Sequence, residues 1–313
     1  MIRVISAFIF LLLLPAAVLA QSGDWAGFSE GSVVSPLDGC TNKFYYYKTT
    51  SPEKQPLVIS LHQWSADYAH FANSLAAQTK GKNWNYIHPD VRGPNNHPKA
   101  AGSDYVISDI DQVIDWAVKN LHADESRIYI VGASGGGYTV LCHFMKSRSP
   151  HRIKEYSVWV PITDLDRWYH ESLARKTRYA NDIIRCVSQD GKTYSAEEAR
   201  ARSPLFMTTP KEKPASAKLK IHAGIHDGYS GAVPIIHSIA FYNKLVRDAG
   251  GTGEALVSDG EAMWMLTART AQPGLKAGRK IGGRAVHCHR SHGNISLVIF
   301  EGGHEILTDA VLE

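Results

Sequence analysis

The segment from Arg127 to Gly137 constrains the fold more than any other part of the chain. It reads RIYIVGASGGG, a short β-branched run followed at once by glycines around one serine, and a helical pattern resumes at Tyr138–Lys146. A serine between a strand and a helix requires a very sharp turn. Only small neighbours such as Gly132 and Gly136 let the two elements pack that closely. The segment therefore predicts a strand–turn–helix unit that exposes the hydroxyl of Ser134 at the end of a sheet.

Short apolar runs alternate with helical patterns along the rest of the chain. Apolar residues recur at helical spacing from Asp109 to Leu121. Strands are predicted at Lys43–Thr50, Pro56–Leu61, Asn83–Pro89, Arg127–Val131, Tyr156–Ile162, Leu219–Ala223 and Ser296–Phe300. This order predicts an α/β fold with a mostly parallel central sheet and helices on both faces. A polar, helix-favouring insert at about 164–210 occupies the position of a small cap, and Gly260–Gly293 is expected to be a loop or hairpin.

Residues 1–20 predict an export signal. They read MIRVISAFIFLLLLPAAVLA, one basic residue followed by an apolar run, a proline and small residues ending at Ala20. The apolar run is short for a bilayer span. We therefore expect 1–20 to be removed and 21–313 to form a single secreted or periplasmic domain, with no membrane partner after cleavage. A net charge of only +4, from 34 basic and 30 acidic residues without basic blocks, argues against nucleic acid as the main partner.

The four cysteines are Cys40, Cys142, Cys186 and Cys288. In an oxidising compartment they can form two disulfides, with three possible connectivities that the sequence does not separate. Because Cys142 falls in an expected buried helix, a free thiol there is an equal alternative.

A serine hydroxyl becomes a useful nucleophile when an imidazole takes its proton and a carboxylate orients that imidazole. His304, in FEGGHE, follows the last predicted strand, and Asp227, in GIHDGYSG, follows the strand before it. These positions give the chain order serine, acid, histidine at the carboxyl ends of strands. Asp164 and Asp166, which follow the strand YSVWVPI, are the rival acids.

The negative oxygen formed during attack on a carbonyl needs backbone N–H donors. One is expected at Gly135, directly after the serine. The second is expected in the loop after PLVISL, at Trp64 or Gln63, where Gln63 can add its side-chain amide.

Three side chains are candidates for substrate contact. Trp64 and Trp168 offer flat rings that suit a sugar or an aromatic acyl group, although they suit an ordinary core equally well. Arg92, in the loop RGPNN, can hold a carboxylate through a forked hydrogen bond, with a structural turn as the alternative. The group His287, Cys288, His289 and His292 has no accompanying carboxylate, so we expect no metal, and nothing in the sequence calls for a cofactor.

GASGGG after RIYIVG, the GIHDG turn and the EGGHE loop together resemble the α/β-hydrolase superfamily. More narrowly, they resemble its secreted carbohydrate and polyester esterases, with prolyl-oligopeptidase-like and dienelactone-hydrolase-like relatives. The resemblance implies an α/β-hydrolase fold with Ser134 as nucleophile, Asp227 as orienting acid and His304 as base.

The leading functional expectation is a secreted serine esterase that works through an acyl-enzyme. Its expected substrate is a small-molecule or polysaccharide ester, such as the acetyl, methyl or feruloyl esters of plant cell walls. The alternatives are a serine peptidase of the prolyl-oligopeptidase type and a non-catalytic binding protein that kept the hydrolase scaffold.

Overall fold

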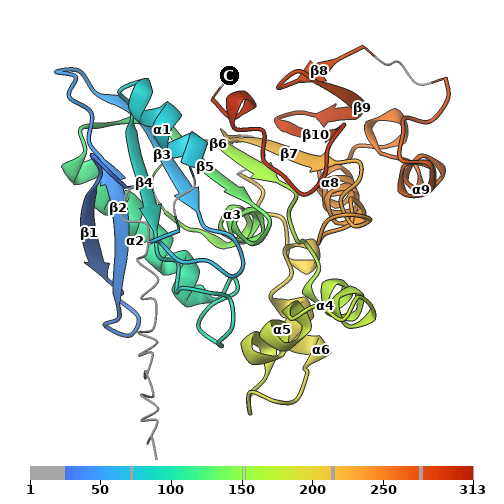
Figure 1. Ribbon diagram of the computed structural model, residues 1–313, viewed down its shortest axis with the longest axis horizontal. Helices are drawn as coiled ribbons and strands as arrows, with labels where there is room; N and C mark the ends of the chain where they lie inside the picture. The colour runs from blue at the N-terminus through green and yellow to red at the C-terminus, as the bar shows by residue number, and fades with distance from the viewer. Residues whose placement is uncertain are drawn as a thin grey trace, which may run out of the picture.

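The computed structural model describes residues 25–70, 73–149, 151, 153–212, 216–274 and 278–312. The expected export signal lies outside these residues. Within them, one sheet of ten strands runs in the order β1-β2-β4-β3-β5-β6-β7-β10-β9-β8 (Figure 1). The six strands from β4 to β10 in this order are parallel, and antiparallel strands flank them on both sides. The predicted α/β class with a mostly parallel central sheet is confirmed.

The strands are β1 (Ser29–Val34), β2 (Thr41–Tyr47), β3 (Gln55–Leu61), β4 (Asn85–Pro89), β5 (Ala123–Ala133), β6 (Ile153–Trp159), β7 (Lys218–Gly224), β8 (Lys280–Ile281), β9 (Arg284–His292) and β10 (Ile295–Phe300). The longer helices are α1 (Asn73–Gly81), α2 (Asp104–Asn120), α3 (Gly135–Lys146), α4 (Leu165–Ala174), α5 (Tyr179–Val187), α6 (Ala196–Ala201), α8 (Ile236–Asp248) and α9 (Asp259–Ala268). Between β6 and β7, the insert supplies α4, α5 and α6, which group together away from the sheet in Figure 1.

The alternation of side chains along the strands gives the sheet two apolar faces. On β10, Leu297 and Ile299 belong to the cluster covered by α2, α3 and α8. Val298 and Phe300 belong to the cluster covered by α1 and the C-terminal segment. Helices therefore cover both faces, as predicted.

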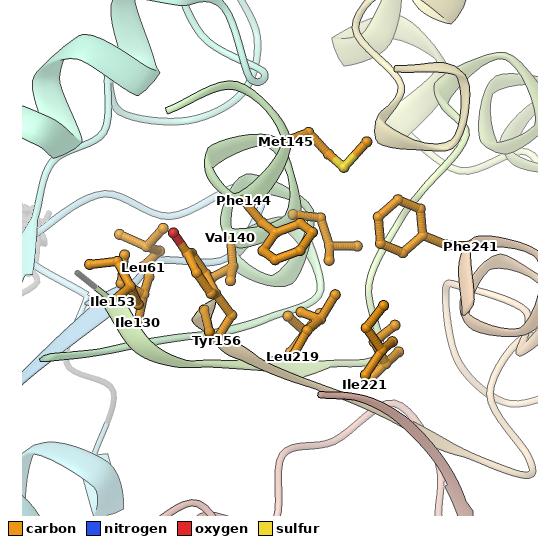
Figure 2. Close-up of a cluster of buried hydrophobic side chains, with 14 of the residues drawn as sticks. Leu61, Ile130, Val140, Phe144, Met145, Ile153, Tyr156, Leu219, Ile221 and Phe241 are labelled. Carbon is orange, nitrogen blue, oxygen red and sulfur yellow. The ribbon is translucent and has the colours of Figure 1, made fainter. Parts of the chain in front are cut away.

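The larger cluster fills the space between α3 and the central strands. Figure 2 shows Phe144 and Val140 of α3 above Tyr156, Leu219 and Ile221 of the strands. The rings of Phe144 and Tyr156 meet edge to face, with centroids 5.2 Å apart, a favourable aromatic geometry. This packing fixes α3, and with it the turn that precedes the helix, against the sheet.

Residues 260–293 contain more regular structure than expected. Most of α9 lies in this region, and β8 and β9 form an antiparallel hairpin against β10. The exposed and buried residues of α9 show little segregation by polarity, since Met263 and Trp264 are exposed. A helix without a clear apolar stripe escapes pattern-based prediction.

All four cysteines are unpaired in the structure, so the expected disulfides are not formed in it. Cys40 is exposed, whereas Cys142, Cys186 and Cys288 are buried. Burial raises the pKa of each buried thiol to about 12, because a thiolate would lose its hydration. These three thiols therefore pack as small apolar groups. No helix in the described ranges has both the length and the apolar character needed to cross a membrane.

A buried histidine makes the stability of the fold sensitive to acid. The ring of His222 on β7 stacks on Trp159, with centroids 4.0 Å apart, and burial lowers its pKa to about 3. In the unfolded chain a histidine has a pKa of about 6.5. Between about pH 6.5 and pH 3 the unfolded state therefore binds a proton at His222 that the folded state does not bind. We expect His222 alone to lower the free energy of unfolding by about 2 kcal/mol between pH 7 and pH 5.

Urea unfolding of the wild type and of His222→Phe at the two pH values checks this. The variant keeps an aromatic ring against Trp159 but cannot take up a proton. It should therefore lose less stability on acidification than the wild type, and equal losses would contradict the prediction.

Candidate active site

The strand register brings three loops to the same edge of the sheet. Ala133 at the end of β5 is paired with Trp159 of β6, which is paired with His222 of β7. His222 is paired in turn with Val298 of β10. Because these strands are parallel, the residues that follow them leave the sheet at one edge, where such folds build their sites.

Ser134 lies in the sharp turn predicted between β5 and α3. Its backbone has φ 57° and ψ −120°, a conformation that costs a non-glycine residue free energy and persists only where the surroundings enforce it. The Ser134 N–H donates to the carbonyl of Trp159 at 2.9 Å, which ties the turn to the neighbouring strand. The Ser134 side chain makes no capping hydrogen bond to α3, so its hydroxyl remains available for chemistry.

Two glycines permit the close packing around this turn. A Cβ atom on Gly132 would lie 2.4 Å from the backbone carbonyl carbon of Gly136. A Cβ atom on Gly136 would lie 2.2 Å from the carbonyl oxygen of Leu61 on β3. Both contacts are with backbone atoms that cannot swing aside, so the predicted need for glycine at these two positions is confirmed.

Asp227 and His304 lie in direct contact. The His304 Nδ1 atom is 2.7 Å from Oδ2 of Asp227, and the carboxylate is 1% exposed. The other carboxylate oxygen, Oδ1, accepts the N–H groups of Gly228 at 2.9 Å and Val233 at 3.1 Å. Since a carboxylate only accepts, Nδ1 carries the proton and Nε2 of His304 is left as the basic nitrogen.

The close approach of the loop after β7 to Asp227 and His304 depends on a glycine at position 231. A Cβ atom there would lie 2.3 Å from Oδ1 of Asp227 and 2.6 Å from Cβ of His304. The loop after β7 can therefore fold over the acid and the histidine only with glycine at this position.

The rival acids have other partners. Asp164 is the N-cap of α4 and accepts the N–H of Arg167 at 3.0 Å. Asp166 accepts the hydroxyl of Tyr194 at 2.5 Å. Of the three carboxylates that the sequence left open, Asp227 is the one that contacts His304.

The loop after β3 passes over the start of α3. A Cβ atom on Gly135 would lie 2.3 Å from the backbone nitrogen of Trp64, so the two backbones touch and only glycine fits. Neither N–H group has a hydrogen-bond acceptor among the described residues. The close approach thus involves Trp64 rather than Gln63, whose carbonyl oxygen accepts Nδ1–H of His62 at 2.9 Å.

The tryptophans expected to contact substrate are core residues instead. Trp64 is 2% exposed and Trp168 is 1% exposed, and their rings meet edge to face with centroids 4.9 Å apart. The Trp168 Nε1–H donates to the carbonyl of Ala232 at 3.0 Å. An aromatic residue beside a site can either pack in the core or contact the ligand, and both of these rings pack in the core.

Arg92 is also buried rather than open to substrate. Its guanidinium pairs with Asp109 through Nε and with Asp38 through Nη1 at 2.8 Å, and Nη2 reaches the hydroxyl of Ser35 at 2.8 Å. The two carboxylates raise the pKa of Arg92, although burial by itself opposes the charge. The forked geometry that suggested substrate recognition is used by the protein's own carboxylates.

A cavity of about 270 Å³ lies beside the turn. Gly132 and Ala133 of β5, Gln63 and Ile306 contribute to its lining, together with the buried His62 and His88. Burial lowers the pKa of both histidines, and that of His88 falls to about 3, so both rings are neutral near pH 7.

His287 of β9 and His226 of the loop after β7 share one carboxylate, that of Glu301. His287 donates to Glu301 at 2.8 Å, and the same carboxylate accepts Nε2 of His226 at 2.7 Å. Glu301 thus ties the residue before Asp227 to the hairpin and to the strand that leads to His304. Sequence reasoning missed this bridge, because nothing in the sequence signals that positions 226, 287 and 301 meet.

Solved structures similar to this chain have the same fold. They include the acylaminoacyl peptidase of Pyrococcus horikoshii, with 17% identity and a TM-score of 0.54 over 72% of this chain and 36% of that one. A puromycin hydrolase matches with 15% identity and a TM-score of 0.56 over 91% of this chain and 37% of that one. A puromycin-hydrolyzing peptidase of Mycobacterium tuberculosis has 17% identity and a TM-score of 0.53, over 72% and 34% of the two chains. The chain thus spans about a third of the length of these proteins. No curated protein sequence matches it.

The sequence model of the prolyl oligopeptidase family, peptidase family S9, matches residues 79–272, more than half of the chain. The match includes the positions of Ser134 and Asp227. It overturns the expectation of a carbohydrate esterase, which was wrong because esterases and peptidases share one set of catalytic groups and the rings taken for sugar contacts are buried. The chain belongs to the prolyl oligopeptidase family of the α/β-hydrolase superfamily.

Proposed function

We propose that the protein is a serine peptidase that hydrolyses the amide bonds of short peptides or aminoacyl amides through an acyl-enzyme at Ser134. The observation that carries the proposal is the hydrogen bond between His304 and the buried Asp227, at the sheet edge where the strained turn presents Ser134. Membership of a peptidase family supports amide rather than ester substrates. The similar structures are named for acylaminoacyl peptides and for puromycin. Cleavage of either substrate is consistent with the proposed hydrolysis of amide bonds.

In the proposed mechanism, Oγ of Ser134 attacks the substrate carbonyl while its proton passes to Nε2 of His304. Asp227 stabilises the imidazolium through the bond to Nδ1–H. The imidazolium then gives the proton to the leaving amine as the carbon–nitrogen bond breaks. Water hydrolyses the acyl-enzyme by the same route, with His304 again as the base.

The tetrahedral oxyanion is proposed to accept the N–H groups of Gly135 and Trp64. Their backbones touch, and neither group has an acceptor among the residues that the structure describes. Unused N–H donors at the start of α3 and in the loop that touches it, next to the nucleophile, are what an oxyanion hole requires.

Replacing Gly135 by alanine tests this assignment. The new Cβ atom would meet backbone atoms of Trp64 at 2.3 and 2.4 Å, so the loop must move away. We expect turnover to fall by about 100-fold or more, the cost of losing one oxyanion donor. The matched control is Gly81→Ala, whose Cβ atom meets nothing within 4 Å, and it should keep wild-type turnover. An active Gly135→Ala enzyme would count against the assignment.

We also propose that the protein is exported, on the basis of the leader at 1–20.

A panel of chromogenic substrates tests the proposed function. Prolyl, acetylaminoacyl and aminoacyl p-nitroanilides are compared with p-nitrophenyl acetate, with the Ser134→Ala protein as the blank. We expect at least one amide to be cleaved by the wild type and not by the variant. Serine-dependent hydrolysis of the ester with no hydrolysis of any amide would refute the peptidase assignment.

A further inference from the structure

The insert between β6 and β7 holds the loop that carries the proposed acid. Arg175, at the C-terminal end of α4, directs both terminal nitrogens of its guanidinium to backbone carbonyls of this loop. Nη2 donates to Gly228 at 2.7 Å, and Nη1 donates to Gly231 at 3.1 Å and to Ala232 at 3.3 Å. A planar guanidinium can serve three acceptors in this way, whereas an ammonium group is a single point of charge.

One peptide group connects this contact to the acid. The carbonyl of Ala232 accepts Arg175 Nη1 and also Nε1–H of Trp168. The N–H of the same peptide group, which belongs to Val233, donates to Oδ1 of Asp227 at 3.1 Å. Hydrogen bonds in such a chain polarise one another, so donors on the carbonyl side strengthen the N–H as a donor to the carboxylate.

The C-terminal half of α4 has a second anchor, separate from the contacts of Arg175. Glu171 of α4 accepts Nε2 of His237 at 3.2 Å, and His237 is buried at the start of α8, directly after the acid loop. Arg175 therefore projects from a helix that is fixed to the element on the far side of the loop. The side chain of Arg175 is exposed, so it contributes little to the core.

We propose that Arg175 is a positioning residue, which holds the loop at 228–232 so that Asp227 keeps its hydrogen bond to His304. The proposal rests on the proposed catalytic role of Ser134, Asp227 and His304. It makes a residue of the insert part of the support for the site, although the residue touches neither substrate nor the reacting atoms.

The test measures the rate at which a fluorophosphonate probe labels Ser134 in the full chain, as a function of pH. This readout needs no knowledge of the natural substrate. We expect Arg175→Ala and Arg175→Lys to fold with wild-type thermal stability and to be labelled about tenfold more slowly, because small displacements of catalytic groups cost rate. Arg175→Lys retains the charge but loses the fork, so a looser Asp227 should also lower the apparent pKa of the base in its profile.

The matched control is Arg185→Ala, which removes an exposed guanidinium from α5 of the same insert without a contact to the acid loop. It should be labelled like the wild type. Millimolar guanidinium should restore part of the labelling rate of Arg175→Ala. If both Arg175 variants match the wild type in rate and pH profile, the positioning role is refuted while the nucleophile stands. If the wild type itself is not labelled, the proposed function fails and the positioning role fails with it.

Discussion

The Ser134→Ala protein is expected to lose about 10⁶-fold in the proposed peptidase turnover, the scale seen when a serine nucleophile is removed from comparable enzymes. Without the hydroxyl no acyl-enzyme forms, and only the oxyanion donors and substrate binding remain to accelerate attack by water. The fold should tolerate the change, because the Ser134 side chain makes no capping hydrogen bond to α3.

Initial rates on the best p-nitroanilide of the panel, with fluorophosphonate labelling in parallel, measure this effect. Thermal unfolding of the variant serves as the control for folding. Turnover within tenfold of the wild type, in a folded and unlabelled variant, would show that another residue carries the chemistry.

Asp227→Asn is expected to lower turnover by about 10⁴-fold while leaving the shape of the site intact. An asparagine amide can donate to Nδ1 of His304, which then holds the ring in the tautomer with the proton on Nε2. In that tautomer the ring cannot take the proton of Ser134. The loss should fall on kcat, because the change affects proton transfer rather than substrate contact.

The matched control is Asp164→Asn, a carboxylate at the corresponding place after β6 that caps α4. Asparagine is also a good N-cap, so this variant should stay folded and active. A large loss in Asp164→Asn together with a small one in Asp227→Asn would reverse the assignment of the acid.

The positions of the proposed catalytic groups could be predicted because each follows its own strand. Parallel strands end at one edge of a sheet, so the strand pattern alone predicted that Ser134, Asp227 and His304 follow strands that end at the same edge, and the structure shows the contact between Asp227 and His304. The glycine requirement around Ser134 was also foreseeable, since it depends on local backbone packing.

The substrate contacts could not be predicted in the same way, because the neighbours of a side chain come from distant parts of the chain. Arg92 suited a ligand carboxylate by type, yet Asp38 and Asp109 occupy its donors. Trp64 and Trp168 suited a ring by type, yet they pack on each other. The proposed role of Arg175 could not be predicted for a related reason, since its partners are backbone carbonyls that carry no sequence signature.

The buried indole of Trp168 contacts both the loop after β3, which holds Trp64, and the loop after β7, which holds Asp227. Its ring rests on Trp64, whose backbone N–H is one proposed oxyanion donor, and its Nε1–H holds the loop of the proposed acid. A substitution of Trp168 would therefore affect both the stabilisation of the oxyanion and the proton transfer by His304. The effects of substitutions in the loop after β3 and in the loop after β7 should therefore be non-additive, because both loops contact Trp168. A substitution that shifts one of these loops would then require a compensating substitution in the other.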